Sequence, residues 1–350
     1  ISHGGAWNVI QDLGKKLSEV EEEQAKRASS GQGLGEIVTP ILFEEADGVW
    51  INMQRKDRPK KGRKCEMKMA AAYDGWELEG KDRYTLRNKV MVCGFEDSKS
   101  FQSKKEGAIA AVFNTDEITM RILNGDGGGW IKAGLFDADV HFQLDPFHKN
   151  REITRKVKDE KQRETVKKLL EEKRIEDMLA YIKGIAELAE EEAEKKKLHE
   201  LYEYFSSNKE GLIPYQERGL KLPEPPEGVE YRNLGTMEHQ VCDTAAKRMK
   251  HQKASWSKSG AGNLGRILCR KVCGNLYDTV TTLSRMALPE RYIETIEEVL
   301  SAAKAPKKDG RGYLYPVRGR NPFTEAFMTN GRKAILSMLG DRSGSELIYR

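Results

Sequence analysis

Long apolar runs are missing from this chain, since no stretch approaches the roughly 18 consecutive apolar residues of a membrane-spanning helix. Cysteine is scarce as well, with five residues among 350 and no Cys-x-x-Cys pair. Cys269 and Cys273 are one helical turn apart, but the sequence offers no second pair to complete a zinc site. These absences exclude a transmembrane protein and predict reduced thiols in a cytoplasmic protein without a structural zinc.

A dinucleotide-binding fingerprint is also missing. The glycines of SSGQGLGEI, at 29–37, follow no strand, so they predict a flexible linker rather than a phosphate-binding loop. The linker ends a helix predicted over 2–28, in which apolar side chains recur at helical spacing. These side chains are Trp7, Ile10, Leu13, Leu17 and Val20.

Positive charge is unevenly distributed along the chain, although the net charge is only +5. Residues 51–70 carry eight basic and two acidic side chains, residues 241–290 carry nine and three, and residues 301–350 carry ten and four. A single such block is typical of a solvated surface loop. Three blocks together favour a polyanionic partner, and we therefore expect nucleic acid binding.

Beyond the linker the pattern changes to strands, predicted over 41–52, 65–78, 84–95, 118–128 and 139–145. A helix is predicted over 100–114, between the third and fourth strands. Three adjacent strands followed by helix, strand, short helix and strand indicate an α/β layer with a mixed sheet.

The composition changes again after Asp145. Residues 151–210 contain fifteen basic and sixteen acidic side chains, with apolar residues at three- and four-residue intervals, which predicts an all-helical segment. The proline-rich stretch GLKLPEPPEGVEY, at 219–231, ends that segment. Helical character returns from 236 to about 253, and the tail over 304–350 is rich in glycine and arginine.

Three carboxylates stand at positions suited to metal chemistry. Asp47 lies inside an apolar strand, Asp126 lies in the glycine-rich turn after a strand, and Glu238 begins the helix after the insertion. Hard divalent cations take carboxylate oxygens and leave positions open for phosphate. The residues alone leave alternatives open, namely Asp116, Asp137 and Asp139 for the second position and Glu230 for the third.

Several local strings resemble insertion-sequence DDE transposases of the ISLre group, which are related to the Mutator-like enzymes. ADGVWINMQ and CEMKMAAAYDGWE resemble the first two core strands of that group, and ILNGDGGGWI resembles its second-aspartate segment. LDPFHKNREI resembles its Asp-x-x-His stretch, and MEHQVCDTAAKRMKHQKASWSKSGAGNLGRIL resembles its Glu-bearing helix and the Trp-Ser-Lys segment beyond. The Glu-bearing string reads Met-Glu-His-Gln where the group's pattern is Glu-Gly-His.

The resemblance implies an RNase H-like core with a mixed sheet, interrupted by an all-helical insertion. It implies that Asp47, Asp126 and Glu238 are catalytic and bind Mg²⁺ or Mn²⁺, as two ions. The implied function is metal-dependent cleavage and strand transfer of an insertion sequence in double-stranded DNA, by a homodimer or higher homo-oligomer associated with a prokaryotic nucleoid. The alternatives are another metal-dependent nuclease of this fold and a domesticated, non-catalytic DNA-binding protein.

The resemblance also divides the chain into parts. We expect a remnant of an N-terminal DNA-binding region with its linker over 1–37, core over 38–150, helical insertion over 151–234, core again over 235–303 and a basic tail over 304–350. Asp145 and His148 are the expected supporting residues, and His148 would either orient a phosphate or support the metal site. The expected DNA contacts, through phosphates and through stacking of a tryptophan ring on bases, are Arg55, Lys60, Lys61, Arg63, Arg248, Lys253, Trp256 and Lys258.

Overall fold

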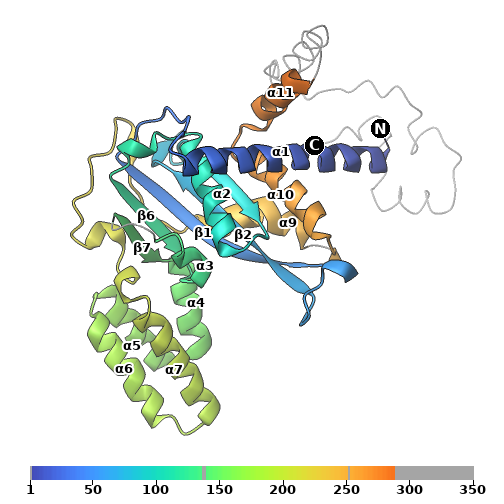
Figure 1. Cartoon of the computed structure of the whole chain (residues 1–350). Coiled ribbons are helices and arrows are strands. Elements are labelled where there is room, and N and C mark those ends of the chain that lie inside the picture. Colours follow the sequence, from blue (N-terminus) through green and yellow to red (C-terminus); the bar gives the residue numbers. More distant parts are fainter. Residues whose placement is uncertain (1, 136–138, 251–252, 288–350) are drawn as a thin grey trace, which may run out of the picture. The chain divides into compact units, whose positions relative to one another are not determined.

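The computed structural model describes residues 2–135, 139–250 and 253–287 (Figure 1). The chain divides into two units, Ile1–Ile293 and Glu294–Arg350, and all of the described residues belong to the first. The basic tail predicted over 304–350 therefore lies outside the described residues. None of the described helices is both long enough and apolar enough to cross a membrane.

A five-stranded sheet forms the centre of the described unit, with the strand order β5-β2-β1-β6-β7. Strands β5, β2 and β1 pair antiparallel, whereas β1, β6 and β7 pair in parallel. The prediction of an α/β fold with a mixed sheet is thus confirmed. The bounds are β1 (Ile41–Asn52), β2 (Lys64–Tyr73), β5 (Val90–Gly94), β6 (Met120–Gly125) and β7 (Val140–Leu144).

Strand β1 is buried on both faces because its side chains alternate between hydrophobic clusters on the two faces. Leu42 and Ala46 pack on the face that α2 (Ser98–Ala110) covers, whereas Val49 and Ile51 pack on the opposite face. That opposite face is covered by α8 (Met237–Val241), the π-helical turn η5 (Cys242–Ala246), α9 (Lys247–Met249) and α10 (Lys258–Val272).

A second, three-stranded sheet has the order β4-β3-β8 and was not foreseen from the sequence. The strands predicted over 65–78 and 84–95 are each divided, because Gly75 and Asn88 adopt positive φ angles of 141° and 49°. The chain turns at these positions and its later or earlier part joins the small sheet. The bounds are β3 (Trp76–Leu78), β4 (Tyr84–Leu86) and β8 (Val229–Glu230).

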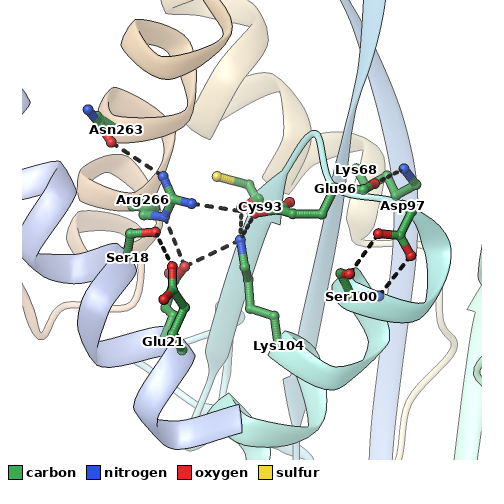
Figure 2. Close-up of polar contacts among 11 residues, drawn as sticks. Ser18, Glu21, Lys68, Cys93, Glu96, Asp97, Ser100, Lys104, Asn263 and Arg266 are labelled. Carbon is green, nitrogen blue, oxygen red and sulfur yellow. Dashed lines mark hydrogen bonds and ion pairs between the residues drawn. The ribbon is translucent and has the colours of Figure 1, made fainter. Parts of the chain in front are cut away.

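The N-terminal helix α1 (His3–Ser29) packs against α2 and α10. Figure 2 shows the buried charges at this junction, where Glu21 accepts a hydrogen bond of 2.9 Å from Arg266 Nε and lies 3.4 Å from Lys104 Nζ. Lys104 and Arg266 both also contact the Glu96 carboxylate, just after β5. Charges from α1, α2, α10 and the sheet edge therefore neutralise one another in one network.

Four helices follow β7, each with an apolar face toward a shared cluster that includes Leu144 and Phe205 (Figure 1). They are α4 (Pro146–Lys156), α5 (Glu160–Glu171), α6 (Ile175–Leu188) and α7 (Glu192–Ser206). The remaining described helices are α3 (Gly129–Lys132) and α11 (Leu276–Ala287), with short 3₁₀ turns η1 (Arg55–Asp57), η2 (Thr115–Glu117), η3 (Lys209–Gly211) and η4 (Tyr215–Glu217). The helical segment predicted after Asp145 is thus helical in the structure.

Candidate metal centre

Asp47 and Asp126 stand side by side on neighbouring strands. The parallel pairing of β1 and β6 ends at Ala46 and Gly125, and the residue that follows each of them is an aspartate. Neighbouring strands are about 4.8 Å apart, which brings the two backbones of these residues close together. Asp47 is only 8% exposed, whereas Asp126 is half-buried in the turn after β6.

Glu238 and His148 converge on Asp47 from two other elements. Each of the three side chains offers a ligand atom that lies within 4.8 Å of the other two. His148, on α4, is 6% exposed, and Glu238, on α8, is exposed. The two carboxylates offer the oxygen ligands that hard divalent cations such as Mg²⁺ and Mn²⁺ take. The group thus combines a buried imidazole with an exposed carboxylate.

The α8 side of the group is fitted to the sheet by an apolar stripe. Met237, Val241, Ala245 and Met249 recur every fourth residue and pack on the same face of β1 and β2. An α-helix has 3.6 residues per turn, so a strict repeat of four would drift around the helix. The wider π-helical turn η5 lies in the middle of this stretch and keeps the stripe on one face. Glu238, next to Met237, is thereby held near Asp47.

His148 is oriented by neighbours on both of its ring nitrogens. Its Nε2 is 3.6 Å from Asp47 Oδ1, and its Nδ1 is 3.0 Å from the guanidinium of Arg151. A guanidinium only donates, so in the neutral ring Nδ1 accepts and Nε2–H faces Asp47. Burial works to lower the pKa of His148, but the hydrogen bond and charge of Asp47 outweigh it, and the pKa is raised. His148 thus supports Asp47 as a hydrogen-bond donor in this arrangement.

Asp145 holds the first turn of α4. Its Oδ1 accepts the backbone N–H of Phe147 at 2.9 Å and of His148 at 3.1 Å, which makes it the N-cap of the helix. Pro146 occupies the first helical position, where no N–H is needed. Asp145 therefore belongs to the scaffold that positions His148, and no ligand role is required to explain it.

Glu45 is a buried carboxylate that positions the start of α8. It is fully buried, and its Oε2 accepts the backbone N–H groups of Gly235, Thr236 and Met237 at 2.9, 2.9 and 3.3 Å. Its Oε1 accepts the hydroxyl groups of Thr236 and Tyr73, both at 2.6 Å. These bonds fix the chain one residue before Glu238 to the strand that carries Asp47.

Asn124 links the two positioning carboxylates. Its amide Nδ2 donates to Glu45 Oε2 at 3.1 Å and to Asp145 Oδ2 at 2.9 Å, and the side chain is fully buried on β6. A line of hydrogen bonds therefore runs beneath the metal-ligand group from α8 through β1 and β6 to α4. Such outer partners orient ligands and tune their binding.

Asp126 stands next to this group but outside the three-residue cluster. Its Oδ1 accepts the N–H of Gly128 at 2.8 Å, and the hydroxyl of Tyr204, on α7, donates to its backbone carbonyl at 2.9 Å. Glu66 lies nearby and accepts a hydrogen bond of 3.3 Å from the Trp130 indole. Burial raises the pKa of Glu66, and the charges of Asp126 and Asp47 raise it further. Negative charge is therefore concentrated at this edge of the sheet.

The alternative carboxylates do not join the group. Asp116 is exposed in η2, and Asp139 is exposed just before β7, at the end of the sheet where β6 begins. Glu230 lies in the small sheet, where it accepts from Tyr84 and pairs with Arg232. Asp137 lies outside the described residues.

Most of this chain is similar in sequence to known proteins. Residues 1–285 match the model of an uncharacterised protein family, UPF0236. The chain belongs to the UPF0236 family. It is 26% identical over 236 residues to a Streptococcus gallolyticus protein named "UPF0236 protein in vanSb 3'region". The aligned part is 64% of this chain and 48% of that protein. A UPF0236 protein of Caldanaerobacter subterraneus subsp. tengcongensis is 31% identical over 157 residues, covering 44% of this chain and 32% of the relative. The chain thus spans about half or less of the length of these relatives.

The predicted DNA-binding residues of this UPF0236 chain are mostly solvent-accessible. The exposed side chains are Lys60, Lys61, Arg63, Arg248, Lys253 and Lys258, whereas the side chain of Arg55 lies outside the described ones. Trp256 is half-buried, and its indole N–H donates to the Met249 carbonyl at 3.0 Å. Its backbone also pairs with the end of β1, so the structure gives Trp256 a packing role. Its stacking on DNA stays a prediction.

Proposed function

We propose that this UPF0236 protein is a DDE transposase, which cleaves DNA at the ends of an insertion sequence and joins those ends to target DNA. The observation that carries the proposal is the convergence of Asp47, His148 and Glu238, with Asp126 one residue beyond the strand that pairs with β1. The carboxylates come from strand β1, the turn after β6 and helix α8, and carboxylates that meet in this way can hold the ions of phosphodiester chemistry. The order of three antiparallel strands followed by two parallel ones supports an RNase H-like core.

Asp47, Asp126 and Glu238 would hold two Mg²⁺ or Mn²⁺ ions. When bound, the ions would activate the attacking oxygen and stabilise the oxygen that leaves the phosphorus. In cleavage, water oxygen bonds to phosphorus and the bond to the 3′ oxygen breaks, which leaves a 3′-hydroxyl. In strand transfer, that 3′ oxygen bonds to the phosphorus of a target phosphodiester, and the target's own bond from phosphorus to its 3′ oxygen breaks, which leaves a 3′-hydroxyl on the target. His148, held by Asp145 and Arg151, keeps Asp47 in place through both steps.

The names of relatives add independent support for a mobile element. One UPF0236 protein of Caldanaerobacter subterraneus subsp. tengcongensis, 30% identical over 157 residues, carries eleven locus designations in a single printed name, and another carries four. Repeated loci for one protein in one organism are what an element that copies or moves itself would produce. This favours a transposase over a nuclease that serves its host.

The partners follow from the charge distribution. The exposed cations around β1 and α10 would bind the phosphates of double-stranded DNA without reading its sequence. Two element ends must be handled together, so we propose a homodimer or higher homo-oligomer that works at the prokaryotic nucleoid.

The test uses the chain with DNA segments taken from both flanks of its own gene. Wild-type protein with Mg²⁺ should cut these segments, and it should join a pre-cut end with a 3′-hydroxyl to plasmid DNA. Asp47→Asn, Asp126→Asn and Glu238→Gln should each lower both activities by orders of magnitude while DNA binding persists, because the basic side chains are unchanged. Glu230→Gln is the matched control and should keep both.

Each alternative gives a different result in the same assay. Cutting without joining would identify a plain nuclease of this fold. Binding without either reaction, in the presence of both Mg²⁺ and Mn²⁺, would identify a non-catalytic DNA-binding protein. Near-normal activity of Glu238→Gln would remove Glu238 from the site.

A further inference from the structure

An aromatic ring stands uncovered at the edge of the candidate metal centre. Phe147 is 46% exposed and belongs to none of the hydrophobic clusters formed by the described residues. Single exposed apolar side chains are common on protein surfaces and need no explanation by themselves. Phe147 differs from the other exposed apolar side chains of the described part of the chain in its contact with His148, a member of the metal-ligand group.

The ring is held in a defined position. The backbone N–H of Phe147 is fixed by the Asp145 cap, at the rigid start of α4. The ring meets the His148 imidazole edge to face, with centroids 5.6 Å apart and an interplanar angle of 89°. The Arg151 guanidinium lies 5.6 Å from the ring centroid and adds a cation–π contact. A flexible surface side chain would not be fixed by three such partners.

The surroundings indicate what the ring binds. Arg151 is an exposed cation beside the ring, and it can contact a phosphate while the ring meets the attached base. Proteins that bind single-stranded nucleic acid combine aromatic rings and cations in this way, because every base offers a face for stacking. In an intact duplex the bases are stacked on one another, so only an unpaired base can reach the ring.

We propose that Phe147 stacks on an unpaired base next to the phosphodiester that is cut, with Arg151 on the adjoining phosphate. This inference rests on the proposed function, because the metal centre defines where the cut phosphodiester lies. Phe147 is then a positioning residue that makes the enzyme prefer a DNA end with an opened base pair over a fully paired one.

The test compares two short duplexes from the gene flanks, one fully paired and one with a fluorescent aminopurine left unpaired beside the cut position. Binding is measured with Ca²⁺ in place of Mg²⁺. Wild type should bind the unpaired duplex about tenfold more tightly and quench its fluorescence, since tenfold corresponds to about 1.4 kcal/mol, which is within reach of one stacked base. Phe147→Ala should abolish both the preference and the quenching, without weakening binding of the paired duplex. Phe147→Trp should restore them.

Leu188→Ala is the matched control, because Leu188 is also an exposed apolar residue, 83% exposed, but lies at the end of α6. It should behave as wild type. Equal preference and quenching in wild type and Phe147→Ala would overturn the inference, as would a wild type without any preference. Neither result depends on cleavage, so the inference can fail while the proposed function stands. A wild-type protein that does not cleave DNA would count against the proposed function, and the binding and quenching measurements would still test stacking on Phe147 by itself.

Discussion

The buried carboxylate of Glu45 binds the chain at the start of α8 to strand β1, and its replacement tests how firmly this segment is held. It accepts six hydrogen bonds, from Tyr73, Asn124, Gly235, Met237 and, twice, Thr236. In Glu45→Gln an amide NH₂ takes the place of one acceptor oxygen, and the remaining hydrogen bonds lose the charge of the carboxylate. A hydrogen bond to a charged group contributes about 1.5–3 kcal/mol, and a buried polar group left without a partner costs about 1–3 kcal/mol.

We therefore expect Glu45→Gln to lower the free energy of unfolding by about 1.5–3 kcal/mol, measured by urea denaturation. The matched control is Glu79→Gln, because Glu79 is exposed and only 3.6 Å from Arg83 in a surface ion pair. That change should cost less than about 1 kcal/mol. A loss below about 1 kcal/mol in Glu45→Gln would refute the argument that these bonds hold the start of α8.

The remaining predictions concern the basic loop and two charged networks. The loop after β1 exposes three cations, Lys60, Lys61 and Arg63. Their joint replacement by alanine should weaken binding to every DNA sequence and flatten the salt dependence of binding. An unchanged salt slope would show that the loop is only a solvated turn. Glu21 is 4% exposed, whereas the side chain of Glu19 is 63% exposed. Glu21→Gln should therefore lower the free energy of unfolding by about 3–5 kcal/mol and Glu19→Gln by less than about 1 kcal/mol. Equal losses of stability in thermal denaturation would contradict the buried network. Burial opposes ionisation of Glu44, but Arg121 and Lys105 outweigh it and lower the pKa of Glu44, so its stabilising contribution is present above the unfolded-state pKa and is lost as the pH falls through the folded-state pKa. Unfolding of wild type should therefore become easier below about pH 4.5, and Glu44→Gln should show a shallower dependence on pH.

Much of the fold could be predicted because apolar periodicity is strong where the sheet is buried. The strand over 41–52 is found with the same bounds, since alternate side chains of β1 enter two different clusters. The same periodicity also contains the signal for Glu45, which lies two residues before Asp47 and therefore on the same face of the strand. An acidic residue at that spacing in a buried strand needs donors, and the structure supplies them from the start of α8.

The small sheet and the support of His148 could not be predicted in the same way. The turn at Gly75 is encoded in one residue, and β8 joins β3 from more than 150 positions along the chain, so nothing local reveals the pairing. Arg151 meets His148 only because the two are three residues apart on α4, and a helix surface shows such a contact only once its orientation is known. Trp256 has a sequence context typical of a nucleic acid contact, and that contact stays a prediction; the sequence did not reveal that its indole donates to the Met249 carbonyl while its backbone pairs next to the end of β1.

We propose above that Asp47, Asp126 and Glu238 hold divalent cations where β1, the turn after β6 and α8 meet. The most direct measurement is the anomalous scattering of crystals of the protein soaked in Mn²⁺. We expect manganese coordinated by carboxylate oxygens of Asp47 and Glu238, with Asp126 in the same centre and no ligand from residues 151–230. Manganese bound only elsewhere, or held by a carboxylate from the helical insertion, would contradict it.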